Sequence, residues 1–218
     1  QFIKAKKILE NKKQNLPQEE IKETEKRLLN AYALFLIDKT EWCRELEERI
    51  KIDGEIDEIL EGLLKDYPDH GPSINVYARF LMGYAKILPK YNKGGKNLEK
   101  AEKLLTEFIK RKNKQDISYF ISLNILATYL YRQKHSFYKQ PTDFEQVERF
   151  LEESSQSFNS KHNSVVYNEL GQVYSRWAND FRKKRDTQEY DKKMELADLA
   201  YLFSMLLKIV AAHMRHKS

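Results

Sequence analysis

Histidine and glycine are the residue types whose spacing in this sequence comes nearest to a chemical site. The five histidines are scattered, and His213 and His216 stand one helical turn apart, where two imidazoles could share a metal ion. The segment Gly94-Gly95-Lys96 has the residue types of a phosphate-binding loop but neither its spacing nor a preceding strand. We therefore expect a solvated chain end and a flexible connection between helices.

Motifs for catalysis are absent from the rest of the sequence. The chain has no G-x-x-x-x-G-K-[ST], H-E-x-x-H, G-x-S-x-G or C-x-x-C motif. Carboxylates such as Glu152 and Glu153 are of the kind that charged helix surfaces carry. Cys43 is the single cysteine, which argues against a disulfide framework or a thiolate metal cluster and fits a reducing compartment. The sequence predicts a cytoplasmic protein that is not an enzyme and has no cofactor or metal ion.

The elements that would position any site are helices. Hydrophobic residues make up 41% of the 218 residues, while 7 Gly and 5 Pro interrupt the chain. The formal net charge is +6, with 39 Lys plus Arg and 33 Asp plus Glu mixed along the length, as on the solvated faces of amphipathic helices. The stretch from Leu199 to Met214 is interrupted by Lys208 and is shorter than the roughly 20 apolar residues of a membrane span. No signal peptide is recognised, and a start at Gln1 predicts a fragment or a processed chain.

One short pattern recurs along the chain. In its clearest copy a large aromatic residue, a Leu-Gly pair and a tyrosine stand at offsets of 0, 3, 4 and 7, from Tyr167 through Leu170 and Gly171 to Tyr174. Two earlier copies hold Tyr77, Phe80, Leu81 and Tyr84, and Leu123, Leu126, Ala127 and Leu130. These offsets place the side chains on one face of a helix, where a small glycine would let a second helix approach closely.

This pattern resembles the first helix of a tetratricopeptide repeat, a unit of two helices. A second helix recurs as well, with a small or branched residue, a large apolar residue four positions later and a third position three after that. Its first positions are Ile56, Ala101, Val147 and Ala197, spaced by 45, 46 and 50 residues, and its third positions include Ser154 and Ser204. The tetratricopeptide period is about 34 residues, and HEAT-like pairs, with about 40 to 47, compete on length. The Leu-Gly-x-x-Tyr signature favours the tetratricopeptide type.

The resemblance implies an all-α fold, a right-handed α-solenoid of antiparallel helix pairs. Residues 1–218 would form one repeat domain of a longer chain, with units at 1–17 (partial), 18–69, 70–114, 115–160 and 161–218. These units hold nine helices, of which the first, over residues 2–15, is unpaired. We also expect Asp53 and Thr142 to be helix N-caps, because each precedes a first turn that carries carboxylates.

The resemblance also selects binding residues, because the first helix of each tetratricopeptide unit lines a concave surface. The corresponding positions of the three best units hold mainly cations and amides. They are Arg79, Met82 and Lys86, then Asn124, Thr128 and Arg132, then Asn168, Gln172 and Arg176. Tyr131 and Trp177 fall outside the packing positions, and one of them would be an exposed anchor. Such a row would accept carboxylates or an extended peptide, and the competing interpretation is three solvated cations that share a register.

Three functions stay open. The first is a protein-interaction scaffold or ligand-sensing domain for a protein or acidic peptide; the last unit also resembles the repeat arrays of signal-transducing NTPases in antiviral and innate-immune proteins. The second is nucleic-acid binding, favoured by the basic runs at 110–112 and 182–185. The third is self-association through the C-terminal helix, where Leu199, Leu202, Phe203, Leu206, Leu207 and Val210 cover much of the circumference. No membrane partner is expected.

Overall fold

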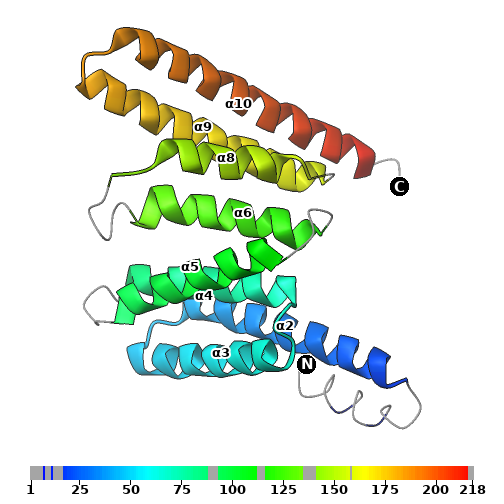
Figure 1. The fold of residues 1–218 in the computed structure, drawn as a ribbon. Helices are drawn as coiled ribbons and strands as arrows, with labels where there is room; N and C mark the ends of the chain where they lie inside the picture. Colours follow the sequence, from blue (N-terminus) through cyan, green and yellow to red (C-terminus); the bar gives the residue numbers. More distant parts are fainter. Residues whose placement is uncertain are drawn as a thin grey trace. The chain divides into compact units, whose positions relative to one another are not determined.

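The computed structural model describes residues 17–87, 93–111, 116–134, 141–157 and 159–215, together with Lys7 and Asn11. Every regular element in these residues is helical, and no strand occurs among them, as the composition predicts. Eight α-helices and one π-helical turn follow one another in this part of the chain (Figure 1). The expected nine helices exceed this count by one, and the expected helix over residues 2–15 falls outside the described residues except at Lys7 and Asn11.

The chain forms two compact units, Gln1–Gly83 and Tyr84–Ser218. The described part of the first unit contains α2 (Gln18–Trp42), α3 (Leu46–Asp66) and most of α4 (Gly71–Ile87). Helix α2 packs against α3, and α4 is hydrogen-bonded to both of them.

Side-chain hydrogen bonds and buried apolar side chains hold the helices of the first unit together. The Tyr32 hydroxyl of α2 donates a hydrogen bond to Glu55 Oε1 of α3 over 2.8 Å. From α4, Ser73 Oγ donates to Asn30 Oδ1 of α2 over 3.1 Å. The buried apolar side chains of these helices include Ile21, Ala33, Leu36, Ile52, Ile56, Leu60, Leu63, Ile74, Tyr77 and Ala78. Burial of this apolar face is the main stabilising term for the three helices.

Asp53 lies in the middle of α3 and is buried, so the expected N-cap at this residue is wrong. Ile56 and Leu60, which follow it at helical spacing, are core residues, and this spacing places the carboxyl group on the buried face. Arg49 lies one turn earlier, with its Nε 3.9 Å from Asp53 Oδ2. Burial raises the pKa of Asp53 to about 6, although the charge of Arg49 opposes this shift.

The second unit contains the remaining helices, which pack in chain order (Figure 1). They are α5 (Lys93–Arg111), α6 (Ile117–Tyr129), the π-helical turn η1 (Leu130–Lys134), α8 (Phe144–Ser155), α9 (Ser160–Lys183) and α10 (Thr187–Arg215). Each of these α-helices packs against the next one, and α6 also contacts α9. From residue 18 onward, each expected repeat unit therefore holds two of the described α-helices.

Side-chain caps begin three of these helices. Asp116 caps α6, Asp143 caps α8 and Asn159 caps α9, each through a side-chain oxygen that accepts a hydrogen bond from a backbone N–H of the first turn over 2.8 to 3.0 Å. Such caps satisfy donors that have no partner within the helix. The expected cap at Thr142 is one residue too early, because Asp143 takes this role.

Helices α9 and α10 approach each other closely at Gly171. A Cβ atom added there would lie 2.6 to 2.8 Å from ring atoms of Tyr201. The expectation that a small residue at this position allows a close approach of the second helix is therefore confirmed.

Helix α10 includes the most apolar part of the chain. Its segment Thr187–His213, 27 residues long, is sufficiently long and apolar to cross a membrane by length and composition. The helix is longer than the apolar stretch from Leu199 to Met214 because it begins at Thr187, and the part before Leu199 carries Asp191, Glu195 and Asp198. One side of α10 packs on α9, with Ala197, Ala200 and Ser204 buried.

Candidate functional site

Seven of the ten predicted binding residues lie on two parts of the second unit that contact each other. They are Asn124 and Thr128 on α6, Tyr131 and Arg132 on η1, and Asn168, Gln172 and Arg176 at successive turns of α9. We call these seven residues the polar row. Because α6 and η1 are continuous and α6 contacts α9, the row combines residues that are about 40 positions apart in the sequence.

Arg132 is held at the centre of the polar row by three acceptors. Its Nε donates to the Tyr131 hydroxyl oxygen over 2.6 Å, and its Nη2 donates to Glu169 Oε2 and to Gln172 Oε1, each over 2.6 Å. The Tyr131 hydroxyl donates in turn to Glu169 Oε2. The side chain of Arg132 is 32% exposed and that of Glu169 is 13% exposed. The charge of Arg132 is therefore compensated within the protein, by a carboxylate of α9.

The environment of this cluster fixes its protonation states. Burial raises the pKa of Tyr131, and the bond to Glu169 raises it further, so the phenol stays neutral. Burial alone would lower the pKa of Arg132, but the contacts with Tyr131 and Glu169 outweigh burial and raise it. The cluster thus contains a neutral tyrosine beside a charged arginine and the Glu169 carboxylate.

Arg176 differs from Arg132 because its side chain is exposed. Its guanidinium carbon lies 5.1 Å from the centre of the Tyr131 ring, and its Nη1 donates to the Tyr131 carbonyl oxygen over 3.4 Å. A guanidinium that stacks on an aromatic ring has a restricted orientation. Arg176 is therefore the cation of the polar row that is best placed to meet an anion from solution.

The uncharged polar side chains of the polar row differ in their burial. Asn124 is 7% exposed, and its Oδ1 has no hydrogen-bond partner within the described residues. Thr128 and Asn168 are half-buried. A buried acceptor without a donor lowers the free energy of unfolding. An additional N–H or O–H group that bonds to Asn124 Oδ1 would therefore stabilise the protein.

The other three predicted residues lie on α4, which is not one of the helices that form the polar row. Arg79 is exposed and Met82 is buried, both in the first unit, so Met82 contributes to packing. Burial of Met82 overturns its assignment to an open binding surface. The side chain of Lys86 lies outside those that the structure describes.

Neither residue expected as an exposed anchor is exposed. Tyr131 is 1% exposed, because it lies one turn after the buried Ala127 on the core face. Trp177 is half-buried, with its ring 5.5 Å from that of Phe144 and the Lys193 ammonium nitrogen 3.4 Å from its centre. The exposed tryptophan is Trp42, which is 85% exposed at the end of α2.

Glu169 is the residue of this site that sequence reasoning missed. It lies 37 residues from Arg132, and the motif offers no position for a carboxylate partner. An available signal was its position three residues before Gln172, which places the two side chains on one face of α9.

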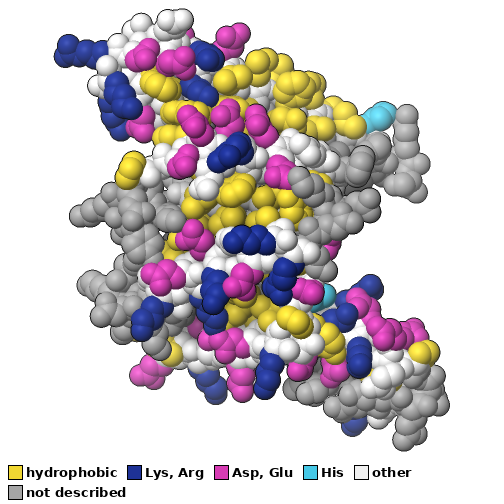
Figure 2. Space-filling model, in the orientation of Figure 1, with side chains coloured by type: hydrophobic (Ala, Val, Ile, Leu, Met, Phe, Trp, Pro, Cys, Tyr) yellow, Lys and Arg dark blue, Asp and Glu magenta, His cyan; other side chains and the backbone are white. Residues whose placement is uncertain are grey.

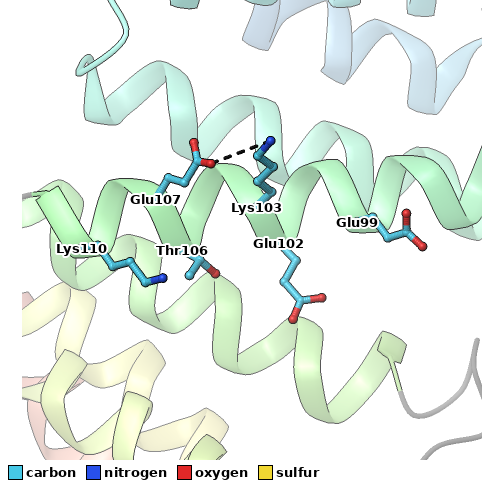
Figure 3. Close-up of a pocket in the computed structure, with 6 residues that line it drawn as sticks. All are labelled: Glu99, Glu102, Lys103, Thr106, Glu107 and Lys110. Carbon is cyan, nitrogen blue, oxygen red and sulfur yellow. Dashed lines mark ion pairs between the residues drawn. The ribbon is translucent and has the colours of Figure 1, made fainter.

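Two shallow grooves lie elsewhere in the second unit. One is lined by α5 alone, through Glu99, Glu102, Lys103, Thr106, Glu107 and Lys110, and Figure 3 shows these side chains spread along the helix. Lys103 and Glu107 are paired over 3.9 Å. The other groove lies where the start of α8 meets the end of α9, beside the rings of Phe144, Trp177 and Phe181. A charged surface supplied by one helix has no converging groups for chemistry.

The described residues contain no group of three or more His, Cys, Asp or Glu side chains that could hold a metal ion. No protein-family model matches the chain, and comparisons with curated proteins and with solved structures found no match.

Proposed function

We propose that this chain is a tetratricopeptide-like α-solenoid that binds an extended, acidic segment of another protein along the polar row. It would serve as a scaffold or ligand-sensing domain, without catalysing a reaction and without a cofactor. A cytoplasmic location fits the single Cys43, which is not in a disulfide.

Hydrogen bonds between tyrosine and carboxylate side chains support a repeated arrangement of units. In each case a tyrosine hydroxyl on the first helix of one expected unit donates to a carboxylate on the second helix of the unit before it. The pairs are Tyr77 with Asp57 at 2.5 Å, Tyr129 with Glu102 at 3.3 Å, and Tyr174 with Glu148. A contact that recurs at corresponding places is expected where each unit stacks on its predecessor.

Hydrogen bonds of buried serines recur between the two helices of a unit, which also supports a repeated arrangement. Ser154 Oγ of α8 donates to the Phe120 carbonyl oxygen of α6 over 2.6 Å. Ser204 Oγ of α10 donates to the Ser164 carbonyl oxygen of α9 over 2.7 Å. Both serines occupy the third position of the recurring second-helix pattern, so this bond joins the two helices of a pair twice in the chain.

The observation that carries the binding proposal is the exposed guanidinium of Arg176, oriented by the ring and the carbonyl oxygen of Tyr131. Gln172 and Asn168 lie one and two turns before Arg176 on α9. Their amide side chains can form hydrogen bonds with a peptide backbone. An arginine with a restricted orientation loses little entropy when it pairs with a carboxylate. The favoured ligand is therefore an extended segment with at least one carboxylate near the Arg176 end of the row.

The test is fluorescence anisotropy with labelled acidic peptides, with and without the substitution Arg176→Glu, over a range of salt concentrations. We expect Arg176→Glu to weaken peptide binding at least tenfold, which is about 1.4 kcal/mol. Arg182→Glu is the matched control, because Arg182 is also exposed on α9 but lies beyond the polar row. Equal losses with both substitutions would indicate attraction by net charge and would contradict a defined site.

Nucleic-acid binding is the alternative outcome of the same experiment. Its best support is the basic run at 182–185, which is exposed throughout. Within this run, however, Lys183 is paired with Asp180 over 3.2 Å and Lys184 lies 5.9 Å from the centre of the Phe181 ring. A short DNA duplex that binds more tightly than the peptides, with steep salt dependence and sensitivity to Arg182→Glu, would replace the peptide proposal.

A further inference from the structure

The C-terminal half of α10 exposes an apolar surface. Its members are each between 46% and 65% exposed, and Figure 2 shows hydrophobic side chains along this part of the helix. They are Leu199, Leu202, Phe203, Met205, Leu206, Ile209 and Val210. We call these seven residues the α10 face. On α9, Val165 is 47% exposed and the Tyr167 ring packs against Phe203 with ring centres 5.5 Å apart, so the apolar surface continues onto α9.

Most of the α10 face points away from the packing of α10 on α9, although the Phe203 ring contacts Tyr167 of α9. After Lys193, the buried residues of the described helix are Ala197, Ala200 and Ser204, which are small and lie on the opposite side at helical spacing. The helix is therefore apolar on two sides in its C-terminal half, and only one of these sides is covered. Contiguous exposed apolar surface of this size is uncommon on a monomer and marks an interaction site.

An exposed stripe of α10 that shares Leu202, Leu206 and Ile209 with the α10 face changes from acidic to apolar along the helix. Its exposed residues recur at spacings of three and four, and they are Asp191, Glu195, Asp198, Leu202, Leu206, Ile209 and His213. The stripe is acidic in its first half, apolar in its second half and ends with a histidine. The sequence after it continues with the basic residues Arg215 and Lys217.

We propose that the α10 face is the interface of a homodimer, in which a second copy of this chain packs its α10 antiparallel to the first. With a twofold axis near Leu206, Leu202 of one copy lies opposite Ile209 of the other. The same register places the acidic Asp198 opposite His213, close to the basic end of the helix. Charge complementarity and apolar contact therefore select the same orientation.

The available area agrees with a dimer of ordinary size. Seven side chains that are about half exposed present on the order of 700 Å² of mostly apolar surface, close to the roughly 800 Å² per partner of a standard interface. The apolar residues lie at the centre of the stripe and the charges at its ends, which is the distribution found in protein interfaces.

A membrane surface fits this face less well. Helices that lie on membranes carry Lys and Arg beside their apolar face and bind anionic lipid. Among the described side chains of α10, exposed Lys192 and Lys208 are outnumbered by exposed Asp191, Glu195 and Asp198, and an anionic lipid surface would repel these carboxylates.

The first experiment measures the mass of the 218-residue chain by light scattering from about 1 to about 100 μM, a range that detects dissociation constants in the micromolar region. We expect a dimer of two 26.0 kDa chains and a monomer after Leu206→Glu with Ile209→Glu. Both residues are about half exposed or more, so circular dichroism should show an unchanged fold. Ile50→Glu, at a residue 47% exposed in the first unit, is the control and should leave the dimer intact.

The second experiment tests the orientation in a Cys43→Ser background. Leu206→Cys lies near the proposed axis and should form a disulfide-linked dimer under mild oxidation, whereas Lys192→Cys, on the same helix but far from the axis, should not. A monomer at every concentration, or a dimer that survives the double substitution, would overturn the proposal. Flotation of a monomeric chain with phosphatidylserine-containing vesicles, lost with the double substitution, would assign the face to a membrane instead. A dimer that cross-links through Lys192→Cys, with or without cross-linking through Leu206→Cys, would refute the antiparallel register.

Discussion

The buried carboxyl group of Asp53 offers the sharpest test of the structure of the first unit. The side chain is 6% exposed in the middle of α3, and Arg49 is 3.9 Å away. Burial raises its pKa from 3.8 to about 6. We predict that Asp53→Asn, which keeps the shape of the side chain and removes its charge, makes the protein more stable at neutral pH.

The magnitude follows from the size of the shift. Each pKa unit corresponds to about 1.4 kcal/mol, so a shift of about two units costs about 2–3 kcal/mol once the carboxyl group is ionised in both states. The folded protein binds the proton more tightly than the unfolded chain does. Asp53 therefore destabilises the protein progressively as the pH rises from about 4 to about 6, and the full cost applies above about pH 6.

The assay is urea unfolding followed by far-UV circular dichroism, at intervals from about pH 4 to about pH 8. The quantity of interest is the difference in unfolding free energy between Asp53→Asn and the parent chain, because other carboxylates cancel in this difference. We expect it to be near zero at about pH 4 and to reach about 2–3 kcal/mol in favour of the variant at pH 7.

Glu58→Gln is the matched control, because it removes an exposed carboxylate from the same helix. Its effect should stay within about 0.5 kcal/mol at every pH. A difference for Asp53→Asn that does not change with pH, or a variant that is less stable than the parent chain at pH 7, would refute the buried, weakly compensated carboxylate described above.

Three further substitutions test contacts of the second unit by urea unfolding. Gly171→Ala should destabilise the protein by about 1–3 kcal/mol because the new methyl group meets the Tyr201 ring, whereas Gly62→Ala, with open space around it, should stabilise it by up to about 1 kcal/mol. Equal effects would contradict the close approach. Ser204→Ala should cost about 1 kcal/mol through the lost bond to a buried carbonyl oxygen, and a neutral result would show that this bond is not important. Tyr131→Phe should cost about 1.5–3 kcal/mol, since it removes a hydroxyl bonded to two charged groups, and double-mutant cycles with Glu169→Gln should show coupling.

The sequence was sufficient to predict helices throughout the described residues, because apolar spacing and the scarcity of Gly and Pro are local signals. The need for a small residue at Gly171 could also be predicted, since its position in the recurring pattern faces the second helix. At Asp53, by contrast, the local sequence pattern gave a wrong prediction of a helix N-cap. An aspartate before glycine and glutamate resembles a cap, but its spacing to Ile56 and Leu60 already placed it on the buried face of a longer helix.

The candidate site was harder to predict because its electrostatics depend on a contact between distant residues. Arg132 and Arg176 share a register in the sequence and look equivalent there. In the structure, Glu169 compensates the first, while the second is exposed beside Tyr131. Nothing near Arg132 in the sequence indicates its partner, 37 residues away. Tyr131 was placed outside the packing positions by the motif, although its spacing from the buried Ala127 pointed to the core.

The compensation of Arg132 also limits how an acidic partner could bind. Three unpaired cations, as the sequence pattern predicts at Lys86, Arg132 and Arg176, would bind acidic peptides mainly by charge, with little selectivity. With Arg132 paired to Glu169, the polar row offers one well-oriented cation, and selectivity would depend on the amides beside it. The peptide proposal uses α6, η1 and α9, whereas the dimer proposal uses mainly α10, so the two proposals depend on different residues. Arg176→Glu should therefore leave the mass of the protein unchanged, and Leu206→Glu with Ile209→Glu should leave binding at Arg176 unchanged for each chain. A change of mass with Arg176→Glu would mean that the two surfaces are coupled and that the polar row takes part in self-association.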